Sequence, residues 1–185
     1  MKVVGIVGSP RLGGNTETIT RIALEEIKKE GLKTELVTLA GKNIQPCDGC
    51  RSCVKTGKCH FKDDFQPVYA KIKRADGVIL ATPVYYGAAT PQITAFISRF
   101  YGTRGKQLKH KVGGPIVVAR RAGKNFTFAQ LMFFFMIHEM IVPGSTYWNV
   151  AFGRNVGEVE KDEEGVRTIK NFARNMVWLI KKINT

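Results

Sequence analysis

KVVGIVGSPRLGGNTETITRIALEEIKKEG, residues 2–31, is the stretch that decides the fold. Its first part, Lys2–Val7, is a continuous apolar run, which is typical of a strand buried on both faces. A glycine-rich turn follows, and apolar residues then recur at helical spacing over Asn15–Glu30, where Gly31 gives a stop signal. Strand, glycine loop and helix in this order indicate an α/β domain.

The rest of the chain repeats this alternation of strand and helix. Further strands are predicted at Thr34–Leu39, Gly77–Thr82, Val112–Ala119 and Met140–Val142, and further helices at Phe65–Ala75, Pro91–Tyr101, Thr127–His138 and Asp162–Ile183. Such alternation predicts a doubly wound parallel sheet with helices on both faces. No repeat or linker interrupts the pattern, so we expect one domain over residues 1–185.

Composition narrows the classes of function. No apolar run approaches the roughly 20 residues of a membrane span, and the N-terminus is too short for a signal peptide, so we expect a cytoplasmic protein without a membrane partner. The 29 Lys and Arg against 15 Asp and Glu give a net charge of +14, which attracts anionic partners. The basic residues are spread along the chain without a nucleic-acid recognition motif. We therefore expect a solvated basic surface rather than a nucleic-acid site.

Two loops that end strands carry candidate ligand-binding residues. In a doubly wound sheet, ligands bind beyond the carboxyl ends of the strands. The first loop, GSPRLGGNTET at 8–18, offers Ser9, Arg11, Asn15 and Thr16 beside the N-terminus of a helix. This donor set favours a single terminal phosphate, and the alternative is a loop in which Asn15 or Thr16 only caps the helix.

The second loop is TPVYYGAATPQ at 82–92, which places Tyr85, Tyr86 and Gly87 after a buried strand. Aromatic side chains beside flexible backbone suit a flat, electron-poor ring. Structural tyrosines are the alternative, and the position opposite the phosphate loop favours the cofactor.

The four cysteines of the chain lie within PCDGCRSCVKTGKC, residues 46–59, at Cys47, Cys50, Cys53 and Cys59. In a cytosolic protein such a group favours metal or redox chemistry over disulfides. Three interpretations stay open: a 4Fe-4S cluster, whose bacterial cysteine run has the same first gaps, an all-thiolate zinc site, or free thiols with a redox-active Cys50–Cys53 pair. The tight gaps of a single loop favour the cluster over zinc.

Several other residues have structural rather than ligand-binding interpretations. Asp63 and Asp64 are predicted to support the start of the next helix, and His60 is expected to be a polar neighbour rather than a ligand. His138 is expected to be a structural histidine. The apolar run Leu131–Met136 predicts a buried helix or a subunit interface.

These motifs together resemble the iron-sulfur flavoproteins, within the NADPH-dependent FMN reductase branch of flavodoxin-like proteins. The resemblance covers nearly the whole chain and implies a flavodoxin-like fold of strand order 2-1-3-4-5 with an inserted four-cysteine loop at about residues 43–62. It also implies a homodimer or homotetramer. It implies that the FMN phosphate is held by Ser9, Arg11, Asn15 and Thr16, the isoalloxazine by Pro83, Val84, Tyr85, Tyr86 and Gly87, and a 4Fe-4S cluster by Cys47, Cys50, Cys53 and Cys59.

One loop departs from the family pattern. Relatives often carry a glycine-rich segment where this chain has ARRAGKNFT, residues 119–127. Arg120, Arg121 or Lys124 could reach a flavin or a nicotinamide phosphate, or could be surface charge. Tyr147 and Trp148, placed after the predicted fifth strand, could cover a flavin of a neighbouring subunit.

The sequence thus predicts a flavin-dependent oxidoreductase. A donor such as ferredoxin, whose acidic character suits a basic surface, would supply electrons through the cluster to FMN and on to a small-molecule acceptor such as a quinone, oxygen or peroxide. The first alternative is an NAD(P)H-dependent FMN or quinone reductase without a cluster. The second is a non-enzymatic basic binding module.

Overall fold

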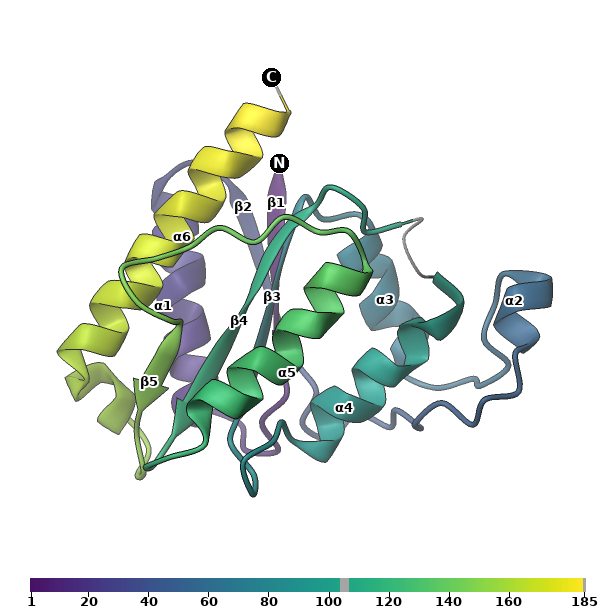
Figure 1. Ribbon diagram of the computed structural model, residues 1–185, viewed down its shortest axis with the longest axis horizontal. Coiled ribbons are helices and arrows are strands. Elements are labelled where there is room, and N and C mark those ends of the chain that lie inside the picture. Colours follow the sequence, from purple (N-terminus) through teal and green to yellow (C-terminus); the bar gives the residue numbers. More distant parts are fainter. Residues whose placement is uncertain (104–106, 185) are drawn as a thin grey trace.

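The computed structural model describes residues 1–103 and 107–184 of the chain. Five strands form one parallel sheet: β1 (Lys2–Val7), β2 (Lys33–Thr38), β3 (Gly77–Pro83), β4 (Val112–Ala119) and β5 (Val150–Phe152). Their order in space is β2-β1-β3-β4-β5 and every pairing is parallel (Figure 1). The predicted doubly wound sheet and its strand order are confirmed.

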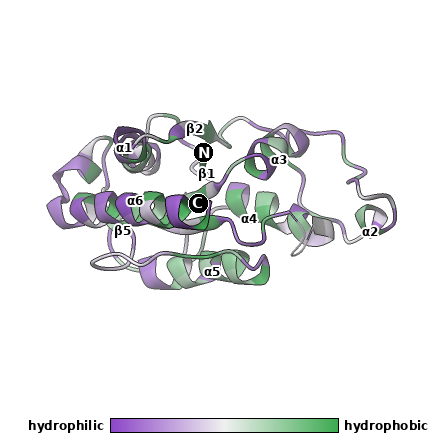
Figure 2. Ribbon diagram, turned by 90° about the horizontal axis from the view of Figure 1, so that it is seen from above, coloured by the Kyte–Doolittle hydropathy of each residue, from purple (hydrophilic) through white to green (hydrophobic). Residues whose placement is uncertain are grey.

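Helices cover both faces of this sheet. Viewed from above, α1 (Asn15–Lys29) and α6 (Glu163–Ile183) lie on one side, and α3 (Phe65–Lys73), α4 (Pro91–Ser98) and α5 (Lys124–Ile137) lie on the other (Figure 2). Neighbouring residues of one strand alternate between the two cores: Val3 packs with α1 and α6, whereas Val4 packs with α3, α4 and α5. This period of two, in strands that are apolar on both sides, explains the continuous apolar runs of the sequence.

The fifth strand is not where the sequence predicted it. Met140–Val142 forms only an isolated bridge, between Ile141 and Val112 at the amino end of β4. Pro143 cannot donate to a strand ladder, and the chain instead crosses to the carboxyl end of β4, where Val150 pairs with Val117. Tyr147 and Trp148 therefore precede the fifth strand rather than follow it.

Helix ends also differ from the predicted ones. The helix predicted for Pro91–Tyr101 is α4, capped by Thr90, and it continues as a 3₁₀ turn, η1 (Arg99–Thr103). The helix α5 starts three residues before the predicted Thr127, after Gly123 at φ 89°. The sequence did not predict two short elements, α2 (Ser52–Thr56) inside the cysteine loop and η2 (Glu158–Lys161) before α6.

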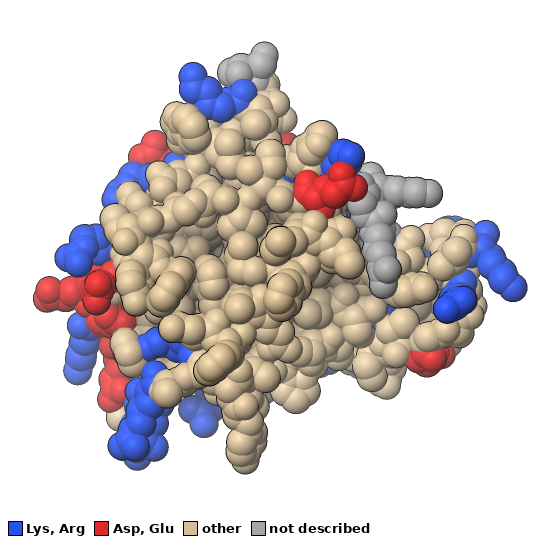
Figure 3. All heavy atoms as spheres, in the orientation of Figure 1, with Lys and Arg blue, Asp and Glu red and all other residues tan. Residues whose placement is uncertain are grey.

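The two faces that α5 presents are both apolar. Leu131, Phe134 and Phe135 are buried against the sheet, while Phe133 and Met136 are exposed, so only part of the stretch predicted as a buried helix or subunit interface is buried in the chain. Figure 3 shows that the face around α5 carries few charged side chains, which gather at its margin. Among the described helices, none combines the length and apolar character that a bilayer crossing needs.

Candidate functional site

A hollow of about 450 Å³ lies at the carboxyl edge of the sheet, and most of the predicted cofactor residues line it. Its walls come from the loops after β1, β3, β4 and β5. The lining residues are Ser9, Arg11, Gly14, Asn15, Thr16, Pro83, Val84, Tyr85, Val118, Ala119, Arg120, Gly153, Arg154, Asn155 and Val156. Seven of the nine predicted FMN residues are thus brought together, and Tyr86 and Gly87 are not among the lining residues.

The loop after β1 is held in shape from inside. Ser9 is buried, and its Oγ accepts a hydrogen bond from the Arg11 backbone N at 3.1 Å. The Glu17 carboxylate accepts from the Gly13 backbone N at 2.9 Å and forms an ion pair with Arg21 at 2.6 Å. That backbone hydrogen bond is the main reason why the pKa of Glu17 is below its ordinary value. The loop is therefore preformed around the amino end of α1, whose first N–H groups have no acceptor within the helix.

Asn15 uses its side chain for a different contact from the predicted one. Its Nδ2 donates to the Asn155 carbonyl O at 2.8 Å, and its Oδ1 accepts from the Val159 backbone N at 3.3 Å. These bonds join the start of α1 to the loop after β5. Asn15 can thus offer its backbone N–H to a phosphate, while its amide positions the wall that carries Arg154.

The cationic side chains at this hollow come from three loops. Arg11, Arg120 and Arg154 line it and are all exposed, so a dianionic phosphate fits between guanidinium groups and helix N–H groups. Lys124 does not join them: its Nζ is buried 2.6 Å from the centre of the Phe152 ring. Burial lowers the pKa of this lysine, and the charge of Asp162 partly offsets the effect.

The loop after β3 forms a tight turn. Tyr85 and Ala88 exchange two backbone hydrogen bonds, at 2.8 and 3.0 Å, and Tyr86 and Gly87 between them have φ of 51° and 78°. Two residues with positive φ define a turn that favours Asn-Gly. Tyr86 occupies the position at which such a turn favours Asn, and it is fully exposed in this strained conformation. Gly123 of the third loop packs on Gly87 and Val84, and an added methyl group would make tight contacts with both, at 3.2 and 3.0 Å.

The cysteine loop projects from the body of the protein beyond α4 (Figure 1). Cys47 and Cys50 are exposed, Cys53 and Cys59 are half-buried, and all four are free thiols. The loop is rich in left-handed backbone, at Gly49, Arg51 and Gly57. Cys47 Sγ accepts from the Gly49 backbone N at 3.5 Å. Four soft thiol donors, one of them with an amide donor already in place, fit a thiolate-bound iron-sulfur cluster.

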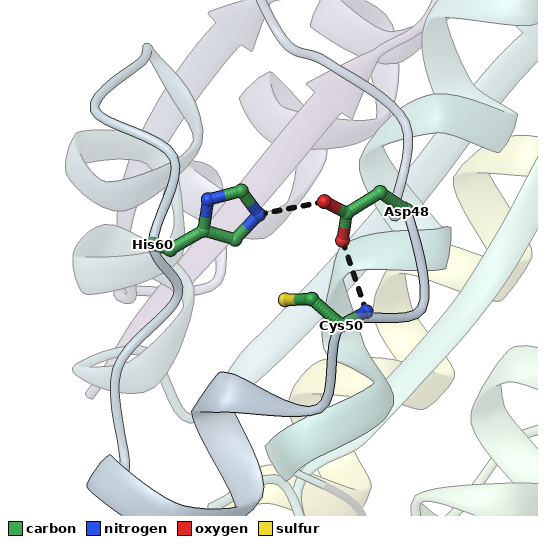
Figure 4. Close-up of side chains that lie close together, drawn as sticks. All are labelled: Asp48, Cys50 and His60. Carbon is green, nitrogen blue, oxygen red and sulfur yellow. Dashed lines mark hydrogen bonds and ion pairs between the residues drawn. The ribbon is translucent and has the colours of Figure 1, made fainter.

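His60 and Asp48 form a pair beside Cys50, as Figure 4 shows. The Asp48 carboxylate lies 2.9 Å from His60 Nε2 and accepts from the Cys50 backbone N at 3.1 Å. The hydrogen bond from the Cys50 backbone N is the main reason why the pKa of Asp48 is below its ordinary value. Ligand atoms of Asp48, Cys50 and His60 lie within 4.8 Å of one another, so His60 is a close neighbour of the predicted ligands.

Three residues under the cysteine loop were not found from the sequence. Arg99 is buried and forms an ion pair with Asp63, Nη1 to Oδ2, at 2.6 Å. Burial acts to lower the pKa of Arg99, but hydrogen bonds and charge interactions with Asp63 and Cys59 outweigh it and hold the pKa above its ordinary value. Ser98 and Gly102, on either side of Arg99, also contact cysteines. Asp63, predicted to support a helix start, accepts from the Phe65 backbone N at 3.1 Å and mainly neutralises Arg99.

His138 agrees with its structural interpretation. It is buried, and its Nδ1 lies 2.7 Å from the Phe134 carbonyl O. Its ring packs against those of Phe100 and Phe134, within the aromatic cluster between α3, α4 and α5.

Comparison with known proteins identifies the class. A family model described as NADPH-dependent FMN reductase matches residues 1–155. The chain is 40% identical to an iron-sulfur flavoprotein of Methanocaldococcus jannaschii, over 99% of both chains. It is 35% identical to one of Methanosarcina thermophila, over 99% of this chain and 97% of the relative.

Solved structures support the same fold. A crystal structure of RosB has a TM-score of 0.79 at 18% identity, over 100% of this chain and 80% of that one. A WrbA-like flavodoxin from Agrobacterium tumefaciens has a TM-score of 0.70 at 15% identity, over 98% of each chain. The fold is therefore flavodoxin-like.

The chain belongs to the NADPH-dependent FMN reductase family and, within it, to the iron-sulfur flavoproteins. It is accordingly a flavin-dependent oxidoreductase with FMN as cofactor. The second alternative from the sequence, a non-enzymatic binding module, is wrong.

Proposed function

We propose that the protein is an electron-transfer flavoprotein that binds FMN in the hollow at the sheet edge and a 4Fe-4S cluster at Cys47, Cys50, Cys53 and Cys59. With both groups bound, electrons from a one-electron donor such as ferredoxin would pass through the cluster to FMN and then to a small-molecule acceptor. One observation supports the proposal: α4 begins beside the loops proposed for FMN and ends at Ser98, which contacts Cys47, so one helix connects the two proposed sites.

The residues at the sheet edge have distinct roles in this proposal. Ser9, Arg11 and the first-turn N–H groups of Asn15 and Thr16 would hold the phosphate. Pro83, Val84 and Tyr85 would form one wall of the flavin site, with Tyr86 and Gly87 at its mouth. The protein thereby sets the position and electrostatics of groups that supply the redox chemistry.

Metal and flavin analysis of anaerobically purified protein tests the proposal. We expect about four iron and four labile sulfides per chain, together with FMN released on denaturation. Cys53→Ser is expected to lose iron and keep FMN, whereas Arg11→Ala combined with Ser9→Ala is expected to lose FMN and keep iron. Protein that binds FMN but takes up no iron on reconstitution would exclude the cluster.

A second candidate is an NAD(P)H-dependent FMN or quinone reductase that works without the cluster. The matched family is described by its use of NADPH, and Arg120 and Arg154 at the hollow could bind the nicotinamide phosphate. Steady-state rates with NADPH and with reduced ferredoxin, measured on the same preparation, separate the two functions. A marked loss of NADPH turnover in Arg120→Ala, with unchanged ferredoxin turnover, would favour the second candidate.

Partner proteins follow from two surfaces. An acidic donor suits the excess of positive charge, and its association rate is expected to fall steeply as ionic strength rises. The exposed apolar residues of α5, Phe126, Phe133, Met136 and Ile137, support a homodimer or homotetramer through this helix. Light scattering should report a smaller mass for Phe133→Glu, whereas Trp178→Glu on the exposed side of α6 should keep the wild-type mass.

A further inference from the structure

The cysteine loop contacts one short segment, Ser98–Gly102, through three of its four cysteines. Ser98 Oγ accepts a hydrogen bond from the Cys47 backbone N at 3.0 Å. The Arg99 guanidinium lies within interaction range of the Cys59 side chain. Gly102 lies so close to Cys53 that a methyl group on it would collide with both the Cys53 Sγ and Cβ. This segment ends α4 and forms most of η1.

Arg99 is the most constrained of the three. Its side chain has no exposed surface, and that of Asp63 is 4% exposed. Arg99 Nη1 donates to the Gln45 carbonyl O at 2.8 Å and to Asp63. The guanidinium also lies between the rings of Phe61 and Phe65, 4.7 and 4.8 Å from their centres. All these partners flank the cysteines in sequence, so Arg99 joins both ends of the loop to α4.

The hydroxyl of Ser98 is similarly fixed. It donates to the Ala95 carbonyl O at 2.7 Å, so its lone pairs are directed at the Cys47 amide. The loop itself consists mainly of exposed residues and one short helix, and few of its side chains are buried. The contacts with Ser98–Gly102 therefore help to keep Cys47, Cys53 and Cys59 in place.

The guanidinium of Arg99 also suits the chemistry of the proposed ligands. A cluster bound by four thiolates is a net anion whose sulfurs accept hydrogen bonds. A guanidinium stays protonated and offers donors in a rigid planar arrangement. Because Asp63 balances its charge, Arg99 is assigned a positioning role.

We propose that Ser98, Arg99 and Gly102 form a platform that positions three cysteine ligands. This inference rests on the proposed cluster and extends it to three positioning residues outside the cysteine motif.

Thiol labelling of the cluster-free protein tests the platform without any loaded group. Gly102→Ala is expected to speed alkylation of Cys53 several-fold, as mass spectrometry of the labelled peptides would show, and to leave the FMN content unchanged. Gly144→Ala is the matched control, because nothing lies within 4 Å of the added methyl group. Equal Cys53 labelling in Gly102→Ala and wild type would overturn the platform.

A single substitution of Arg99 would leave the buried Asp63 carboxylate without its counter-charge. The test of Arg99 therefore needs a double variant. Arg99→Met combined with Asp63→Leu replaces the ion pair with apolar side chains, a change that buried pairs often tolerate. We expect this double variant to bind FMN like the wild type, to retain less iron, and, in the cluster-free protein, to show faster alkylation of Cys59. Wild-type iron content and wild-type Cys59 labelling in the double variant would refute the role of Arg99.

The outcomes separate this inference from the proposed function. If wild-type protein takes up no iron, the cluster fails, while the labelling experiment still decides whether the platform positions the thiols. If wild-type protein takes up about four iron and the variants behave identically, the platform fails and the proposed function stands.

Discussion

Arg99 and Asp63 form a two-pronged ion pair inside the protein, with Nη1 2.6 Å from Oδ2 and Nη2 3.3 Å from Oδ1. Burial alone would raise the pKa of Asp63, but hydrogen bonds from Arg99 and from the backbone of Gln45 and Phe65 hold it below its ordinary value. The pair joins the end of the cysteine loop to α4. The Arg99–Asp63 pair therefore helps to hold the cysteine loop in place.

Asp63→Ala is expected to lower the free energy of unfolding by about 3–5 kcal/mol, because it leaves a buried guanidinium without its counter-charge. Urea unfolding of the cluster-free protein measures this cost. The control is Arg174→Ala, which breaks an exposed ion pair with Glu26 and should cost about 1 kcal/mol or less. Similar losses of unfolding free energy in the two variants would contradict a stabilising role of the Arg99–Asp63 pair.

Glu17 links the stability of the loop after β1 to pH. Its pKa is below the ordinary value, chiefly because the Gly13 N–H donates to it. Its contribution to stability is therefore complete above the unfolded pKa of about 4.3 and is lost as the pH falls through the lower folded pKa.

Melting temperatures between pH 7 and pH 3 test this linkage. Glu17→Gln should melt lower than wild type at pH 7, and the difference should shrink towards pH 3. Glu25→Gln, at an exposed position of the same helix, should melt like the wild type throughout. A constant difference between wild type and Glu17→Gln would count against the carboxylate bond.

Thr90 links α4 to the first loop. Its Oγ1 donates to the Gly8 carbonyl O at 2.5 Å and accepts from the Ile93 backbone N as the helix cap. Thr90→Val should cost about 1–2 kcal/mol of stability and weaken FMN binding, because the Gly8 carbonyl then loses its hydrogen bond to the cap of α4. Flavin fluorescence titration and urea unfolding measure the two effects.

Thr94→Val serves as the control for Thr90, since the Thr94 hydroxyl donates only to Thr90 and Pro91 carbonyls of its own helix among the bonds seen. It should leave FMN affinity unchanged. An FMN affinity equally low in both variants would refute a specific role for the Thr90–Gly8 bond.

Tyr86 is an exposed aromatic residue with positive φ, a conformation that costs energy outside glycine and asparagine. Tyr86→Asn should stabilise the flavin-free protein by a few tenths to about 1 kcal/mol and weaken FMN binding several-fold, because it removes aromatic surface at the mouth of the site. Urea unfolding and fluorescence titration again apply. Unchanged FMN affinity would mean that Tyr86 does not contact the flavin.

Local patterns in the sequence were sufficient for the sheet and for most of the predicted residues that line the hollow at its edge. Lys2–Val7 and the helix after it are adjacent in the chain, and parallel strands bring the ends of β1, β3 and β4 to one edge. The fifth strand was misplaced because Val150–Phe152 has only three residues, whereas Met140–Val142 is just as apolar. A short edge strand leaves little periodicity to detect.

The platform could not be predicted because its contacts join distant parts of the chain. Ser98 and Cys47 are 51 residues apart, and Arg99 and Asp63 are 36 apart. One signal was available: Arg99 follows Phe96 at three residues and adjoins Phe100, on the apolar side of a predicted helix. An arginine at such a position requires a buried acidic partner, and Asp63 was assigned only to the start of the next helix.

The length of α4 sets the distance between the loop after β1 and the cysteine loop. Eight residues of regular helix span about 12 Å, from Thr90 bonded to Gly8 to Ser98 bonded to Cys47. Electron transfer slows steeply with separation, so the number of residues in α4 would set the speed at which two redox groups of one chain communicate. One inserted residue would turn Ser98 and Arg99 by about 100° around the helix axis, and the two sites would then lose both their spacing and their alignment.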